Sequence, residues 1–85
     1  MKLVYHKSFK NRLKKLDPKI RQRFQKRAEL FIRDKFNKQL NNHSVAIAYP
    51  DCRSINITGN YRAIFHDQDD VVTFITIGTH SDLYG

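Results

Sequence analysis

The chain of 85 residues contains few of the residues that stabilise small proteins through covalent links or metals. It has one cysteine, Cys52, three glycines, two prolines and no tryptophan. A single cysteine cannot form an internal disulfide, and without a second one no paired-cysteine zinc site can form. We therefore expect no metal centre. We also expect Cys52 to be an ordinary half-buried residue, because the sequence reveals no base that would activate its thiol.

Long apolar runs are missing as well. No segment approaches the roughly 20 apolar residues needed to cross a bilayer, and residues 1–7 lack the apolar stretch of a secretory signal. We therefore expect a cytoplasmic protein with no membrane partner. The phosphate-binding loop, the dinucleotide-binding glycine fingerprint and the His-Glu-x-x-His motif are also absent, so the sequence predicts no cofactor.

Acidic residues are scarce in the first half of the chain. Residues 1–42 contain fourteen of the 16 lysines and arginines and only three acidic residues, whereas residues 43–85 contain two arginines and five acidic residues. Such an uneven distribution orients a protein toward a polyanion, such as nucleic acid, the ribosome or an acidic protein. The alternative is a basic helical face that only keeps a small protein soluble.

The chain length predicts one domain, residues 1–85, and apolar periodicity predicts two helices after a short strand over residues 3–5. The first helix is expected to be capped by Ser8. The second begins at Asp17-Pro18, because aspartate is a good N-cap and proline is favoured at the first helical position, and it ends between residues 34 and 38. Its apolar stripe consists of Ile20, Phe24, Ala28 and Phe31.

The second half of the chain is typical of β-structure. Residues 54–58 and 61–66 alternate in polarity on either side of Gly59-Asn60, which predicts a hairpin. Residues 71–77 are apolar enough for a central strand, and residues 45–49 are a weaker candidate for another. The fold class predicted is α+β, with an N-terminal strand and an α-helical hairpin packed on one face of a small antiparallel β-sheet.

Strand parity groups the polar residues of these strands. Ser54, Asn56 and Thr58 share one face of the first hairpin strand, and Arg62 shares a face of the second with His66. On the last strand, the same parity places Thr76, Gly78 and His80 opposite Ile75 and Ile77. If the polar faces coincide, one side of the sheet presents a platform for a phosphodiester.

Three of these polar and aromatic residues are predicted to be catalytic. Cleavage of RNA without a metal requires a base, an acid and a cation that stabilises the phosphorane. His80 exchanges a proton in the useful pH range, Arg62 clamps phosphate oxygens, and Tyr84 stacks on a base or donates a hydrogen bond. Each has a simpler alternative: Arg62 pairs with a nearby aspartate, His80 is a surface histidine, and Tyr84 packs against the sheet edge.

Three runs of the sequence, in order, resemble a known family. They are Leu40-Asn41-Asn42-His43, residues 53–65 with Gly59-Asn60-Tyr61-Arg62 at the turn, and Gly78-Thr79-His80-Ser81-Asp82-Leu83-Tyr84. Together they resemble the RelE/ParE superfamily of type II toxins, most closely its YafQ-like branch of mRNA interferases and plasmid stabilisation proteins. The resemblance implies a toxin that cuts mRNA in the ribosomal A site without a metal, with a cognate antitoxin as partner.

The resemblance also implies roles for individual residues. His80 matches the catalytic histidine, Tyr84 the C-terminal aromatic residue, and Arg62 the arginine of the Gly-x-Tyr-Arg motif. The residues assigned to RNA binding are His43, Arg53 and Asp82. For Asp82, capping a local turn is an equally good interpretation.

The sequence departs from the YafQ-like pattern at one informative place. YafQ-like chains often carry a histidine after an Asp-Cys pair, whereas Asp51-Cys52 is followed here by Arg53-Ser54. The second proton-transfer group is therefore not identified from the sequence. Two other functions stay open: a ParE-type inhibitor of DNA gyrase, which needs no nuclease chemistry, and a non-catalytic module that binds nucleic acid or the ribosome.

Overall fold

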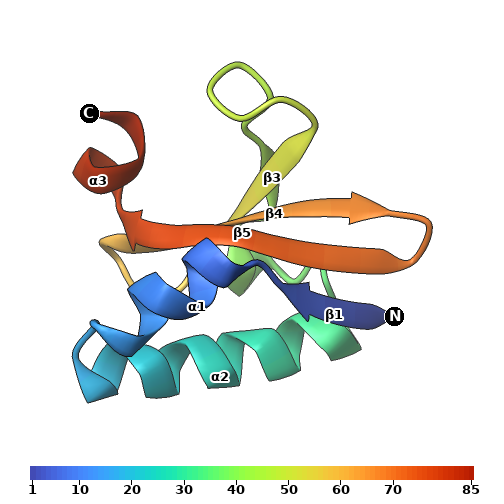
Figure 1. The fold of residues 1–85 in the computed structure, drawn as a ribbon. Coiled ribbons are helices and arrows are strands. Elements are labelled where there is room, and N and C mark those ends of the chain that lie inside the picture. Colours follow the sequence, from blue (N-terminus) through green and yellow to red (C-terminus); the bar gives the residue numbers. More distant parts are fainter.

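The five strands of the protein form one sheet, in the order β1-β5-β4-β3-β2. The computed structural model describes all residues, 1–85. Its elements are β1 (Lys2–Tyr5), α1 (Lys7–Lys14), α2 (Pro18–Arg33), the 3-10 helix η1 (Lys38–Leu40), β2 (His43–Ser44), β3 (Cys52–Asn56), β4 (Tyr61–Gln68), β5 (Val71–Thr79) and α3 (His80–Tyr84). Helices α1 and α2 lie against one face of the sheet, and α3 lies at the other (Figure 1). None of the helices has the length and apolar character to cross a membrane.

The predicted α+β class is confirmed, with one correction to the sheet. Strand β1 runs parallel to β5, while the other neighbouring strands are antiparallel, so the sheet is mixed. The two strands are far apart in the chain, with both long helices and strands β2 to β4 between them. Parallel strands cannot be joined by a tight turn and need a long connection of this kind.

Local sequence explains where the two long helices begin. The carboxylate of Asp17 accepts a hydrogen bond from the Lys19 backbone N–H at 2.8 Å, and Pro18 is the first residue of α2, as predicted. The predicted cap of α1 was wrong. His6 is the N-cap, and its Nδ1 accepts from the Ser8 backbone N–H at 3.2 Å. The Ser8 hydroxyl instead donates to the Ile75 carbonyl at 2.9 Å, which ties α1 to β5.

The main core fills the space between the helical hairpin and the sheet. Its buried residues are Phe9, Phe24, Ala28, Phe31, Leu40, Ile55, Ile57, Ala63, Phe65, Val72, Phe74 and Ile77. The apolar stripe predicted for α2 is therefore confirmed at Phe24, Ala28 and Phe31, and Ile20 is half-buried. Phe74 lies at the centre of the aromatic part, with its ring centroid 5.3 Å from that of Phe24 and 5.7 Å from that of Phe65.

A smaller apolar cluster lies on the opposite face of the sheet. It contains Cys52, Ile64 and Leu83, with Ile75 and Tyr84 packed against it. Ile75 was expected to share a face with Ile77, but the pairing of β4 with β5 shifts between Ile64 and Phe65, and this irregularity turns Ile75 outward. Burial and the charge of Asp51 raise the pKa of the Cys52 thiol, so Cys52 stays a neutral packing residue.

The segment 45–49 is a turn and not the additional strand considered above. The backbone N–H groups of Ala48 and Tyr49 both donate to the Val45 carbonyl, at 3.1 and 2.9 Å. Strand β2 is correspondingly short, only His43 and Ser44. Pro50 follows directly, and a proline lacks the N–H that would continue a strand ladder. The resulting turn projects from the sheet on the same side as α3 (Figure 1).

Candidate active site

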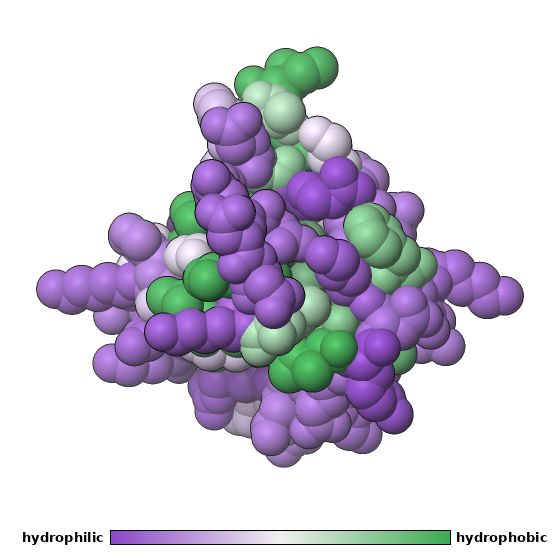
Figure 2. All heavy atoms as spheres, turned by 90° about the vertical axis from the view of Figure 1, so that its right-hand side faces the viewer, coloured by the Kyte–Doolittle hydropathy of each residue, from purple (hydrophilic) through white to green (hydrophobic).

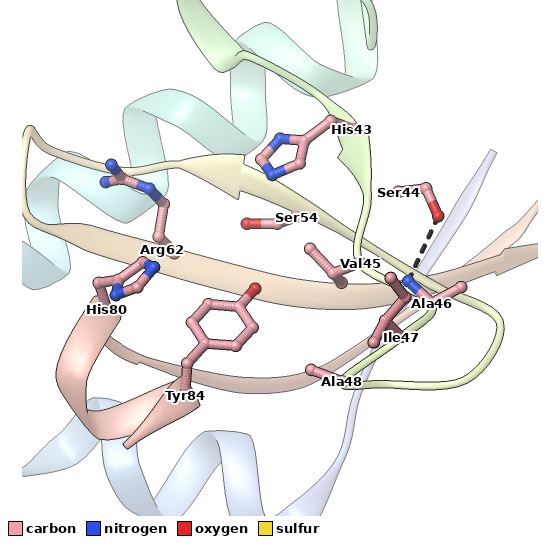
Figure 3. Close-up of a pocket in the computed structure, with 10 residues that line it drawn as sticks. All are labelled: His43, Ser44, Val45, Ala46, Ile47, Ala48, Ser54, Arg62, His80 and Tyr84. Atoms are coloured by element: carbon pink, nitrogen blue, oxygen red, sulfur yellow. Dashed lines mark hydrogen bonds between the residues drawn. The ribbon is translucent and has the colours of Figure 1, made fainter.

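A hollow of about 480 Å³ opens on the face of the sheet that the helical hairpin leaves uncovered. It is bounded by the sheet, by α3 and by the turn after β2 (Figure 3). Ten residues line it: His43, Ser44, Val45, Ala46, Ile47, Ala48, Ser54, Arg62, His80 and Tyr84. Four predicted site residues, which are far apart in the sequence, thus meet in one place. They are His43, Arg62, His80 and Tyr84.

Two of these residues, His80 and Tyr84, lie on the short helix α3. Parity had placed His80 on the last strand, but it is the first residue of α3, so that placement is corrected. Side chains four residues apart share one side of a helix, and the ring centroids of His80 and Tyr84 are 4.8 Å apart. Helix α3 therefore presents an imidazole and a phenol to the hollow together (Figure 3).

A capping box fixes the start of α3. The Thr79 hydroxyl accepts from the Asp82 backbone N–H at 3.1 Å, and the Asp82 carboxylate accepts from the Thr79 backbone N–H at 3.0 Å. These bonds to Thr79 lower the pKa of Asp82, so its carboxylate is ionised at neutral pH. Asp82 thus lies in the cap and outside the lining of the hollow, which agrees with the turn-capping interpretation; its assignment to RNA binding stays a prediction.

The capping box gives a first prediction. Replacing Thr79 with alanine removes one hydrogen bond of the box and is expected to lower the free energy of unfolding by about 1 kcal/mol. Because α3 carries His80 and Tyr84, activity is expected to fall as well. Urea denaturation and an activity assay would measure the two effects. Thr79→Ser keeps the hydroxyl and is the control; equal stability of the alanine and serine variants would contradict the role of the cap.

Tyr84 is held in place by other aromatic and backbone contacts. Its ring packs edge-on against Tyr49, with centroids 5.9 Å apart, and the Tyr49 hydroxyl donates to the Leu83 carbonyl at 2.7 Å. Burial, followed by the neighbouring Tyr49, raises the pKa of Tyr84, while Arg62 acts in the opposite direction. The phenol is consequently protonated at neutral pH. It is a hydrogen-bond donor and a stacking surface, not a base.

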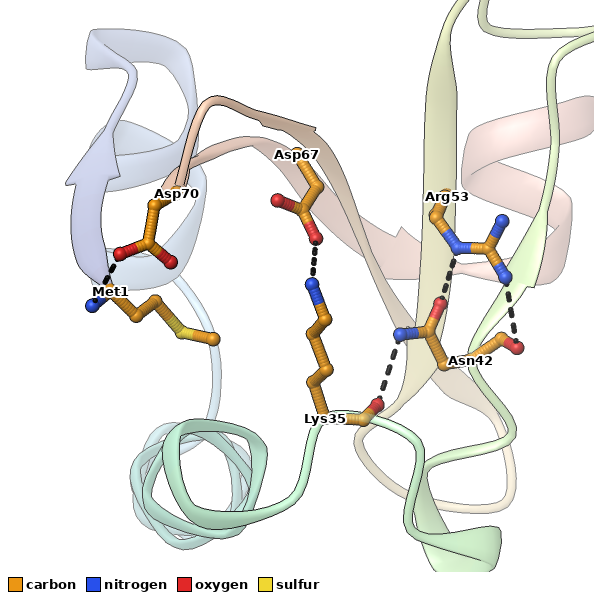
Figure 4. Close-up of polar contacts among 6 residues, drawn as sticks. All are labelled: Met1, Lys35, Asn42, Arg53, Asp67 and Asp70. Atoms are coloured by element: carbon orange, nitrogen blue, oxygen red, sulfur yellow. Dashed lines mark hydrogen bonds and ion pairs between the residues drawn. The ribbon is translucent and has the colours of Figure 1, made fainter.

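Arg62 is anchored at one nitrogen and free at the others. Its Nη1 donates to the carbonyls of Thr58, Gly59 and Tyr61 at 3.0 to 3.1 Å, while Nε and Nη2 have no hydrogen-bond partner. The only two ion pairs of the chain join Met1 to Asp70 and Lys35 to Asp67 (Figure 4). The alternative in which Arg62 pairs with an aspartate is therefore wrong. An unpaired guanidinium at the hollow is available to an anion.

His43 is oriented by the backbone. Its Nδ1 lies 2.7 Å from the Asn41 carbonyl oxygen. A carbonyl oxygen only accepts hydrogen bonds, so in this contact Nδ1 carries the proton, and in the neutral imidazole Nε2 keeps a free lone pair. A histidine held in one tautomer by such a contact is suited to accept a proton at Nε2.

Ser54 also lines the hollow, and although strand parity predicts it on the polar face, the sequence assigns it no role. It is only 1% exposed, and its hydroxyl oxygen has no hydrogen-bond partner. The close-up shows it between His43, Arg62 and Tyr84 (Figure 3). A buried polar group without a partner costs roughly 1–3 kcal/mol, so its persistence calls for an explanation. Strand parity with Asn56 was the one sequence signal for it.

Arg53 lies outside the hollow. Its Nε donates to the Asn42 side-chain oxygen at 2.7 Å (Figure 4). Its guanidinium carbon lies 5.7 Å from the centre of the Phe36 ring. These contacts tie β3 to the segment before β2. RNA binding by Arg53 stays a prediction. No three histidine, cysteine or acidic side chains of the chain are grouped so that they could hold a metal ion.

The fold and a matching family model together identify the chain as a toxin of the RelE/ParE superfamily. Residues 3–84 match the family described as the ParE toxin of type II toxin–antitoxin systems, parDE. The chain therefore belongs to the ParE toxin family, and the predicted superfamily membership is confirmed. No curated protein matches the sequence.

Solved structures share the fold at low sequence identity. YafQ from E. coli strain BL21(DE3) superposes with a TM-score of 0.83 at 16% identity, over 98% of this chain and 97% of that chain. A chain of the RelB–RelE antitoxin–toxin complex from Methanococcus jannaschii gives 0.75 at 22% identity, over 95% and 94%. A YoeB/ParE toxin from Agrobacterium tumefaciens gives 0.77 at 16% identity, over 94% and 99%. At these identities the likeness concerns the fold.

Proposed function

We propose that this toxin is an endoribonuclease that cleaves mRNA through the acid–base chemistry of its own side chains. The observation that carries the proposal is that two imidazoles and an unpaired guanidinium line one hollow beside a protonated phenol. These are the base, the acid and the cation that transfer of the RNA phosphodiester requires. His43 fills the place of the second proton-transfer group, which the sequence did not identify.

The attack begins at His43. Its Nε2 accepts the proton of the ribose 2′-hydroxyl, and the Nδ1 contact with Asn41 holds the ring in the tautomer that can do so. The 2′-oxygen then forms a bond to the adjacent phosphorus. Arg62 donates from Nε and Nη2 to the phosphate oxygens, where negative charge accumulates in the transition state.

The leaving group departs on the side of His80. The bond from phosphorus to the 5′-oxygen breaks, and a protonated His80 transfers its proton to that oxygen. Tyr84, which stays protonated, donates a hydrogen bond or stacks on a base beside His80. The products are a 2′,3′-cyclic phosphate and a 5′-hydroxyl, and His43 and His80 have exchanged protonation states.

The ribosomal A site is the proposed place of cleavage. Helix α2 and its surroundings form a strongly basic surface on the side of the sheet opposite the hollow. A shallow depression there is lined by Arg23, Lys26, Arg27, Leu30, Arg33 and Gln39. None of its cations is in an ion pair. While mRNA occupies the hollow, the basic surface of α2 on the opposite face of the protein is thus free to bind ribosomal RNA.

A cognate antitoxin is the proposed protein partner. Relatives with this fold have been solved as the DinJ–YafQ and RelB–RelE complexes. With a net charge of +8, the chain favours a partner, or a segment of one, that carries negative charge.

Incubation of the purified protein with ribosomes bearing a defined mRNA tests the proposal. The expected result is cleavage with a bell-shaped dependence of rate on pH, because one imidazole must be neutral and the other protonated. His43→Ala is expected to lower the rate by roughly a hundred- to ten-thousandfold and to remove the limb of the profile that reports the base.

The products provide the decisive readout. A 2′,3′-cyclic phosphate on the upstream fragment supports the mechanism, whereas intact mRNA, or an unchanged pH profile in the His43→Ala variant, would contradict it. His6→Gln is the matched control, because His6 lies at the N-cap of α1, outside the residues that line the hollow. Its cleavage rate is expected to match that of the wild type.

The family itself favours a second candidate, inhibition of DNA gyrase, because the matching family is that of the ParE toxins. Such an inhibitor needs no acid–base pair, so the convergence of His43 and His80 argues for the nuclease. A supercoiling assay with purified gyrase separates the two. Inhibition that survives the loss of both histidines, together with intact mRNA, would favour the gyrase target.

A further inference from the structure

The turn after β2 exposes an apolar tip at the edge of the hollow. Its residues, Val45 to Ala48, carry no polar side-chain atoms. Val45 is half-buried against the smaller apolar cluster, whereas Ala46 to Ala48 are exposed, Ile47 fully so. The space-filling view shows an apolar tip standing clear of a mainly hydrophilic surface, where Figure 1 has the loop between β2 and β3 (Figure 2). Three consecutive apolar residues, Ala46 to Ala48, are thus exposed and line the hollow together, and grouped apolar surface beside a hollow is typical of a binding site.

Hydrogen bonds hold this turn in a defined shape. The Val45 N–H donates to the Cys52 carbonyl at 3.0 Å, and the Cys52 N–H donates to the Tyr49 carbonyl at 3.0 Å. The Ala46 N–H donates to the Ser44 hydroxyl at 3.3 Å. The exposed tip is therefore presented by an ordered turn, and little conformational freedom remains to be lost when a ligand binds.

The unpartnered hydroxyl of Ser54 lies within the same hollow. It is almost completely buried, its oxygen makes no hydrogen bond, and it lines the hollow together with the turn. The close-up shows Ser54 beside Val45, with the Tyr84 ring across from Ile47 and Ala48 (Figure 3). A ligand with apolar faces and a polar edge could pack against the turn and the Tyr84 ring and also form a hydrogen bond with the Ser54 hydroxyl.

We infer that the turn Val45–Ala48, the Tyr84 ring and the Ser54 hydroxyl form a subsite for one nucleobase of the RNA. The inference rests on the proposed function, because the subsite adjoins the groups that handle the phosphate, namely Arg62, His43 and His80. A base has two apolar faces, against which Ile47 and Tyr84 can pack, and polar edge atoms, which can form a hydrogen bond with Ser54. A hydroxyl donates or accepts, so the subsite binds several bases and selects weakly among them.

Binding of an RNA that cannot be cleaved tests the subsite apart from catalysis. The probe is a short fluorescent 2′-O-methyl RNA, which lacks the attacking hydroxyl, made either complete or with an abasic nucleotide at each position in turn. The wild type is expected to bind the complete probe about tenfold more tightly than the probe that is abasic at one particular position. Ile47→Ser is expected to bind these two probes equally.

Matched variants separate the subsite from effects on folding. Ile32 on α2 is 53% exposed and lies outside the residues that line the hollow, so Ile32→Ser loses a similar side chain without touching the subsite and is expected to keep the wild-type preference. Ser54→Ala removes the unpaired hydroxyl and is expected to weaken binding of the complete probe several-fold, with a free energy of unfolding that is unchanged or raised.

The outcomes also distinguish this inference from the proposed function. Equal binding of complete and abasic probes by the wild type, or unchanged binding by Ile47→Ser, overturns the subsite even if mRNA is cleaved. A base preference that depends on Ile47 supports the subsite even if no cleavage occurs. Loss of antitoxin binding in Ile47→Ser, with RNA binding unchanged, would assign the turn to protein docking and overturn the inference.

Discussion

Replacement of His80 by alanine is expected to lower the rate of mRNA cleavage by roughly a hundred- to ten-thousandfold, the range that loss of a general acid or base produces. The imidazole lies at the hollow, beside Tyr84, and makes no hydrogen bond within the protein. Because His80 is exposed, its removal leaves the core intact. The measurement is the single-turnover rate on ribosomes programmed with a defined mRNA, alongside the growth arrest caused by expression.

His66→Ala is the matched control for this experiment. His66 lies in β4 and lines a separate depression with Asp51 and Asp67, and it is not among the residues that line the hollow. The control is expected to cleave at the wild-type rate. A His80→Ala variant that unfolds at the wild-type denaturant concentration and remains fully toxic would remove His80 from the reaction.

Arg62 is a less selective probe than His80. Its Nη1 holds the carbonyls of Thr58, Gly59 and Tyr61, so an alanine at this position loosens the hairpin turn in addition to removing the charge. A loss of activity in that variant would mix both effects. The absence of such contacts at His80 is the reason that it gives the cleaner answer.

The sequence predicted the elements whose signals are local. Asp17-Pro18 marked the start of α2 because capping and proline preference act within one turn, and Gly59-Asn60 marked the hairpin for a similar reason. The parallel pairing of β1 with β5 was missed because it joins distant segments. The outward turn of Ile75 was missed because an irregularity in the ladder breaks the alternation on which parity depends.

The site was partly predictable because its residues are chemically distinctive. Arg62, His80 and Tyr84 were chosen from the chemistry of RNA cleavage and from a resemblance, and the structure brings them together with His43. Sheet register accomplishes this, since His43 lies opposite Ser54 on β3, and Arg62 lies opposite Gly78, two residues before His80. The register of the strands cannot be read from local sequence. That His43 and the buried Ser54 lie beside Arg62, His80 and Tyr84 is therefore visible only in the three-dimensional structure.

Replacement of Phe74 by alanine is expected to lower the free energy of unfolding by about 3–5 kcal/mol. Phe74 is completely buried in β5 and contacts the rings of Tyr5, Phe9 and Phe24, among others, so the truncation leaves a cavity where both helices meet the sheet. A chain of this length is stable by only about 4–13 kcal/mol in total. The variant should therefore be close to unfolding at 37 °C, which urea denaturation would measure.

Phe36→Ala controls for the loss of a phenyl ring. Phe36 is 63% exposed, and the cationic ends of Lys35 and Arg53 lie 5.7 Å from its ring centre, so its removal is expected to change stability by less than about 0.5–1 kcal/mol. Similar losses at Phe74 and Phe36 would contradict the described core. Because β5 continues directly into α3, a destabilised Phe74→Ala protein should also lose activity, and stabilisation of the folded state by a bound antitoxin should partly restore its resistance to urea.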